Sequence, residues 1–197
     1  MAHSSGNLLL GYIYEEHAQD VYRGALLVTD SRGIPKDFRY TEPIRPSRLE
    51  KVLYGNALGA YLLEEVILGA LVDALSVSPA LWLCERKSLF LPLYKKSRIP
   101  TFLLHQGGHA PLDHVGEIQP QPQENIFLVQ LYALSDALRI EVPEQETSKM
   151  EQHVALLLEV AETMDVMEPF GRIATALAAV EESPSEPSRN EKLSNLS

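Results

Sequence analysis

Short apolar runs separated by polar turns fill the first part of the chain. Residues 7–14 and 21–30 are apolar and contain β-branched and aromatic residues, a composition typical of buried strands. Residues 35–42 instead alternate, with the aromatic side chains on one side and charged ones on the other, as expected for a half-exposed antiparallel strand. Gly33 can adopt the positive φ that closes a short hairpin between the last two runs. The pattern predicts an antiparallel meander of three strands.

A helical period follows the meander. Ser47 and Glu50 have the spacing of a capping box, and a longer apolar helix is predicted from residue 57 to 75. Residues 80–85 and 101–105 are continuous apolar runs, which is typical of parallel strands buried on both faces. A strand, a crossover and a second strand at this spacing predict a parallel βαβ unit.

The character of the chain changes after residue 105. A stretch rich in Gly, Pro and Gln predicts a long loop. Residues 126–140 are apolar enough for a helix but ambiguous with a strand. Two segments with apolar residues at helical spacing follow and predict two helices. A capping box at Ser148 and Glu151 is expected to start the first of these helices. The predicted division is an α/β core at 1–105, a loop at 106–125, a helical part at 126–182 that packs on the core or a partner, and a disordered tail at 183–197.

The predicted fold class is therefore α/β. It combines a mixed sheet, formed by an N-terminal antiparallel three-strand meander and a parallel βαβ unit, with C-terminal helices. This element order resembles that of ribonuclease H-like domains. Agreement in element order implies a fold but does not by itself imply an activity.

Composition narrows the setting of the protein. The chain has 197 residues, a formal net charge of -10 and one cysteine, Cys84, which we expect to be packed in the core. No run approaches the ~20 apolar residues of a membrane span. These features favour a cytoplasmic protein without a membrane partner, and they make nucleic acid an unexpected partner. Short basic clusters at 45–48 and 94–98 are the exceptions.

Four carboxylates are candidate catalytic residues. The resemblance to ribonuclease H-like domains implies acids on the first strand, on the long helix and at the end of the next strand, converging on two divalent ions. Glu15, Glu64, Glu65 and Glu85 are the residues available at these places. The first strand itself carries no acid before Glu15. The alternative is that one glutamate on the helix is partly buried and bonds a strand backbone or an arginine, and that the others are solvated.

A second candidate is a metal site in the loop after residue 105. His105, His109, Asp113 and His114 lie within ten residues of one another, and imidazoles with a carboxylate suit zinc or another transition metal. Their spacing matches no established zinc motif. Surface histidines and a single general base are the alternatives.

The third candidate is a charged face on the predicted hairpin. Asp30, Asp37, Arg39 and Tyr40 would be the residues that bind a partner or a polar ligand. Cross-strand charge pairs on a solvated sheet face would give the same pattern without any binding function.

These observations lead to two functional hypotheses. The first is a non-catalytic intracellular α/β domain, not an enzyme, that acts by protein–protein interaction or self-association as an oligomer and needs no cofactor. The second is a divalent-metal-dependent phosphoesterase or nuclease with a ribonuclease H-like site.

Overall fold

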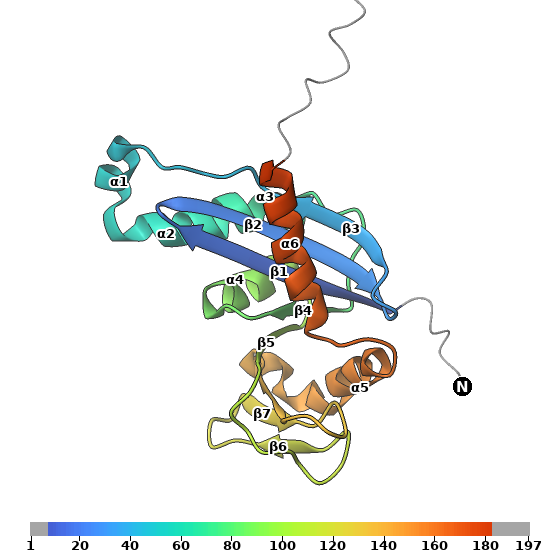
Figure 1. The fold of residues 1–197 in the computed structure, drawn as a ribbon. Coiled ribbons are helices and arrows are strands. Elements are labelled where there is room, and N and C mark those ends of the chain that lie inside the picture. Colours follow the sequence, from blue (N-terminus) through green and yellow to red (C-terminus); the bar gives the residue numbers. More distant parts are fainter. Residues whose placement is uncertain (1–7, 183–197) are drawn as a thin grey trace, which may run out of the picture.

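A computed structural model describes residues 8–182, and Figure 1 shows the arrangement of its elements. Eight strands form one mixed sheet in the order β3-β2-β1-β4-β5-β8-β7-β6. They are β1 (Leu9–Ala18), β2 (Val21–Asp30), β3 (Pro35–Tyr40), β4 (Leu81–Cys84), β5 (Thr101–His105), β6 (Ile118–Pro120), β7 (Ile126–Val129) and β8 (Leu138–Glu141).

Helices cover both faces of this sheet. One face carries the helical segment between β3 and β4 together with α4, and the other carries α5 and α6. The helical elements are α1 (Arg48–Tyr54), η1 (Gly55–Ala57), α2 (Leu58–Tyr61), the π-helical η2 (Leu62–Ile67), α3 (Leu68–Asp73), α4 (Lys87–Ser97), η3 (Glu144–Lys149), α5 (Met150–Ala161) and α6 (Glu168–Glu182).

The predicted meander is present, with a tighter first turn than the sequence indicated. The polar stretch after residue 14 continues β1 rather than forming a turn, because Glu15 to Ala18 pair with Val21 to Gly24 of β2. Only Gln19 and Asp20 remain in the turn, and both have the positive φ required by two-residue hairpins. This extension carries Glu15 into the sheet.

The predicted parallel centre is confirmed. β4 lies between β1 and β5 and pairs in parallel with both. Gly11 of β1 stands opposite Trp82 of β4, and a Cβ on Gly11 would collide with the Trp82 ring. Glycine is therefore required here to let a buried tryptophan lie against the neighbouring strand.

The segment from Arg48 to Asp73 combines an exposed start with a buried end. Its capping box is formed, since Ser47 and Glu50 exchange side-chain-to-backbone hydrogen bonds. Among residues 8–182 it is the one helix long and apolar enough to cross a bilayer, with a mean hydropathy of 1.4 in its most apolar window. A third of that window is buried, and its buried residues include Ile67 and Leu68, which pack in the core.

Residues 126–129 and 138–141 are strands joined by a turn, and no helix forms between 126 and 141, which corrects the prediction of a helical part beginning at residue 126. β7 and β8 pair with each other, and β8 pairs with β5, so both extend the central sheet. Their four-residue runs are buried or nearly so, and buried strands lack the alternation that distinguishes strand from helix.

The two C-terminal helices are present where they were predicted. The capping box at Ser148 and Glu151 is not formed, because residues 144–149 make a 3₁₀ turn and Lys149 occupies the N-cap of α5 without a side-chain cap. α6 crosses the sheet over β1 and β2, and Tyr12 of β1 makes an edge-to-face contact with Phe170. The predicted disordered tail lies outside the described residues.

Candidate active site at the carboxyl edge of the sheet

The carboxyl ends of the three parallel strands meet at one edge of the sheet. In open α/β sheets this edge is where ligands bind. Glu15 lies on the extension of β1, Glu85 directly follows β4, and His105 ends β5. The antiparallel strand β8 brings Arg139 opposite His105 and Glu141 opposite Leu103.

Glu15 has one carboxylate oxygen engaged and one without a partner. Its Oε1 accepts a hydrogen bond of 2.8 Å from the Ser88 hydroxyl in the first turn of α4. Its Oε2 is buried and has no hydrogen-bond partner among the described residues. A buried anionic oxygen is costly unless a donor or a cation approaches it.

The first turn of α4 lies beside Glu15. Its N-cap, Arg86, makes no side-chain capping bond to the first amide groups of this helix. Lys87 in the same turn contacts both oxygens of Glu141 at 3.1 and 3.3 Å. The N-terminus of an 11-residue helix, with its partial positive charge, therefore faces the edge that carries Glu15.

Glu85 and His105 complete the titratable groups of the three strand ends. Partial burial raises the pKa of Glu85, although much of its side chain is exposed. Burial, and then the positive charge of Arg139, lower the pKa of His105. Cys84 is fully buried, and this burial raises the pKa of its thiol, so it is a core residue as expected and not a nucleophile.

Glu64 and Glu65 do not reach this edge group. Both lie on η2, and both are exposed, so neither is the partly buried glutamate that the alternative interpretation required. Within residues 8–182, no three His, Cys, Asp or Glu side chains lie close enough together to hold a metal ion. Of the four predicted catalytic carboxylates, the fold thus places two, Glu15 and Glu85, at the carboxyl edge.

The loop histidines are dispersed in the same way. His105 is half-buried at the end of β5, whereas His114 is exposed and its Nδ1 lies 3.1 Å from a carboxylate oxygen of Glu117. The same carboxylate oxygen accepts a hydrogen bond from the Asp113 amide. These contacts, together with a bond from the Leu112 amide to the buried Gln130, hold the loop by protein groups alone. Within residues 8–182, the partly buried His109 forms no side-chain hydrogen bond or ion pair.

The hairpin candidates have structural partners. The buried Asp30 accepts hydrogen bonds from the amides of Arg32 and Ile34 and pairs with Lys36. Burial alone would raise the pKa of Asp30, but these donors outweigh it and lower the pKa to about 2. The same side chain also pairs with the exposed Arg32 guanidinium.

Asp37 fastens the hairpin to the rest of the fold. Its carboxylate accepts bonds from the amide and hydroxyl of Ser76 and pairs with Arg39 at 2.8 Å. Tyr40 is 43% exposed and contacts the ring of Phe38. A binding role for this face stays a prediction, because the contacts already account for the two aspartates.

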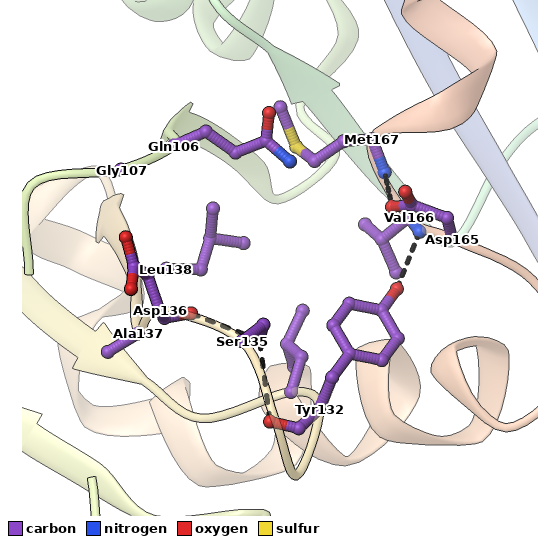
Figure 2. Close-up of a pocket in the computed structure, with 11 residues that line it drawn as sticks. Gln106, Gly107, Tyr132, Ser135, Asp136, Ala137, Leu138, Asp165, Val166 and Met167 are labelled. Carbon is purple, nitrogen blue, oxygen red and sulfur yellow. Dashed lines mark hydrogen bonds between the residues drawn. The ribbon is translucent and has the colours of Figure 1, made fainter. Parts of the chain in front are cut away.

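Sequence reasoning missed a cavity of about 410 Å³ next to the carboxyl end of β5. Figure 2 shows it enclosed by Gln106 and Gly107, by the segment from Tyr132 to Leu138, and by the residues just before α6. The Tyr132 hydroxyl accepts a bond from the Val166 amide and donates to a main-chain carbonyl. No motif indicates this cavity, because its wall combines three segments distant in sequence.

Comparison with known proteins identifies the architecture. No family model matches the chain, and no curated protein matches it. Among solved structures, Endonuclease V from Streptomyces avermitilis superposes with a TM-score of 0.61 and 16% identity, covering 90% of this chain and 83% of that protein. Endonuclease V from Bacillus subtilis gives a TM-score of 0.56 and 10% identity, covering 89% and 80%.

A third similar structure is Endonuclease V from Ciona intestinalis in complex with a DNA that contains an inosine followed by a ribo-adenosine. It has a TM-score of 0.55 and 10% identity, covering 89% of this chain and 86% of that protein. The chain has a ribonuclease H-like fold. The element order seen in the sequence predicted this fold correctly.

The ribonuclease H-like comparisons contradict two of our expectations. The three solved structures described above are endonucleases, so the hypothesis of a non-catalytic protein-interaction domain was wrong. The similar Ciona structure contains DNA. We expected a protein partner or self-association and considered nucleic acid an improbable partner, and this expectation was also wrong. The net charge of -10 is a sum over the whole chain and does not describe any local surface.

Proposed function

We propose that this chain is a nuclease that binds nucleic acid at the carboxyl edge of β1, β4 and β5 and hydrolyses a phosphodiester bond there with a divalent metal ion. The observation that carries the proposal is the Glu15 carboxylate, with one oxygen held by Ser88 and the other buried without a partner. The likeness to Endonuclease V over 88–90% of this chain supports nucleic acid as the substrate class.

The residues at this edge fit a metal ion that is completed by the substrate. Magnesium is commonly held by one or two carboxylates, with water and substrate phosphates supplying its other ligands. Glu15 offers the free oxygen, and Glu85 is the second carboxylate of the edge. A fully protein-built two-metal centre does not fit, since residues 8–182 supply no group of three ligands. When bound, the ion would polarise the phosphate for attack by water.

The protein groups around Glu15 would position the phosphate. The uncapped first turn of α4 presents amide groups and the positive end of the helix dipole, a combination that binds phosphates elsewhere. Ser88 holds Glu15 in a fixed orientation by its hydrogen bond. Partial burial raises the pKa of Glu85, which makes this carboxylate a better proton acceptor than a fully solvated one.

The test is a cleavage assay with labelled single- and double-stranded DNA and RNA oligonucleotides in magnesium or manganese. We expect Glu15→Gln to lower the cleavage rate by at least about 100-fold, because losing a direct metal ligand should cost more than losing an outer contact. The matched control is Glu151→Gln, the same change at an exposed position on α5, which should leave the rate unchanged.

Two results would overturn the proposal. The first is the absence of cleavage of every substrate by the wild-type chain with either metal. The second is an equal rate for Glu15→Gln and wild type, since it would place any activity elsewhere.

A further inference from the structure

α4 and the residues that flank it are basic in an otherwise acidic protein. Residues 86–98 contain five lysines and arginines of the chain's 17 and no aspartate or glutamate. All five residues are exposed. They are Arg86, Lys87, Lys95, Lys96 and Arg98.

These five cations differ in whether acidic groups already neutralise them. Lys87 pairs with Glu141, and Lys96 pairs with Asp73 of α3. For Lys95 and Arg98, in contrast, the described part of the chain provides no ion pair within 4.0 Å. The C-terminal end of α4 therefore carries two uncompensated positive charges.

Both uncompensated charges line a groove between α4 and residues 141–145. The groove has a volume of about 510 Å³, and its lining includes Leu91 and Tyr94. Leu91 is 44% exposed, and the Tyr94 hydroxyl donates a bond to the buried Glu146, which fixes the ring. Apolar and aromatic surface next to free cations is the arrangement that binds single-stranded nucleic acid.

Arg98 has a conformation that favours glycine. Its φ is 59°, in the left-handed region, and its amide closes α4 by bonding the Tyr94 carbonyl. Glycine is the usual residue at such a helix end, and any other residue there is strained. A side chain kept at this cost suggests a use for its charge.

The acidic groups around the groove offset only part of this charge, because two of the three, Glu141 and Glu146, already have partners. Glu141 is paired with Lys87, and Glu146 is buried and contacts Lys149 and His153. Glu144 is the exposed acid that lines the groove. A purely structural explanation is that cations near the end of α4 stabilise its dipole, and the experiment below separates the two roles.

We propose that this groove binds the sugar–phosphate backbone of a single-stranded stretch of nucleic acid, with Lys95 and Arg98 contacting phosphates. The inference rests on the proposed function and extends it, because α4 leads from the groove to Ser88 and Glu15 at the edge. An 11-residue helix is roughly 16 Å long, so the groove would hold nucleotides beyond the reacting phosphate.

The experiment measures the affinity of the full chain for a labelled single-stranded DNA oligonucleotide by fluorescence anisotropy at several salt concentrations. The double variant Lys95→Glu with Arg98→Glu should bind about tenfold more weakly or worse. Its slope of log affinity against log salt should fall by about 1.4, since each phosphate contact on a single strand contributes about 0.7. The control Lys96→Glu makes the same change on the same helix but faces Asp73, and it should keep the wild-type slope.

Arg98→Gly distinguishes binding from stability. Glycine relieves the left-handed conformation, so this variant should unfold at a higher temperature while binding DNA more weakly. If Arg98 served only to stabilise the end of α4, the more stable Arg98→Gly variant would bind DNA as tightly as the wild type.

The outcomes distinguish this inference from the proposed function. If the wild type binds DNA and the double variant binds it equally well, the groove inference is wrong and the edge site stands. If Lys96→Glu weakens binding as much as the double variant, the loss reflects the overall charge of the protein and not contacts in the groove. The groove inference is then wrong as well. If the wild type binds no DNA or RNA, both proposals fail.

Discussion

Asp30 illustrates how a conspicuous residue can serve the fold. Its carboxylate is almost fully buried in the turn between β2 and β3, where two amides and Lys36 surround it. Such a turn anchor needs a charged acceptor, and the sequence pattern that suggested a binding face follows from that need.

We therefore expect Asp30→Asn to destabilise the protein. The pKa of Asp30 falls from 3.8 to about 2 in the fold, a difference equivalent to about 2 kcal/mol of stability from ionisation. Because the folded pKa is lowered, this stability is present above pH ~4 and is lost as the pH falls through about 2. Urea unfolding at pH 7 should show the loss, and the gap between variant and wild type should narrow on acidification. A gap independent of pH would contradict this account.

Glu15, unlike Asp30, is a carboxylate whose structural contacts do not fully account for it. Its neighbours satisfy one oxygen and leave the other buried without a partner, so packing alone does not explain it. Glu64 and Glu65, which looked similar in the sequence, are solvated on η2. The difference lies in the surroundings of each carboxylate and not in the residue type.

At the scale of elements, the helical segment from Arg48 to Asp73 shows that amphipathicity does not guarantee burial. Its first turns carry an apolar face that no described residue covers, and the exposed fractions are 66% for Leu49, 73% for Val52 and 71% for Leu53. Farther along, Leu68 is 1% exposed and packs in the core. Both parts have helical periodicity, but the sheet extends under only one of them.

Two matched substitutions test this difference. Leu68→Ala should lower the free energy of unfolding by about 2–5 kcal/mol, because it removes buried methyl groups and leaves a cavity. Leu53→Ala makes the same chemical change on an exposed surface and should change stability by less than about 0.5 kcal/mol. Denaturant unfolding of both variants gives the comparison. A large loss from Leu53→Ala would mean that this face is covered in solution.

At the scale of the whole molecule, the fold gathers strand ends that lie far apart in sequence. Glu15 and Glu85 are 70 residues apart along the chain, yet both lie at the carboxyl edge of adjacent parallel strands. The edge lacks a third acidic ligand within residues 8–182, so metal binding should depend on a substrate phosphate.

This dependence predicts a coupled stabilisation. Magnesium alone should leave the melting temperature unchanged. DNA at about 100 times its dissociation constant should raise it by roughly 5–10 °C, and magnesium should increase that rise. Glu15→Gln should retain the effect of DNA and lose the addition by magnesium. Thermal unfolding with each component alone and together checks this, and a shift with magnesium alone would point to a preformed metal site instead.

The sequence by itself determined the features that depend on near neighbours. The antiparallel meander, the parallel run of β4 and β5 and the capping box at Ser47 all follow from local periodicity and turn chemistry. The order of these elements was enough to predict the ribonuclease H-like architecture.

Only the tertiary structure decided which surfaces meet. It made strands of β7 and β8 by pairing β8 with β5 and β7 with β8, and it left the apolar face of α1 uncovered. It also selected Glu15 from several similar acids and placed the free cations of α4 along a groove. The physical reason is that periodicity encodes the shape of one element, whereas burial and convergence depend on partners distant in the chain.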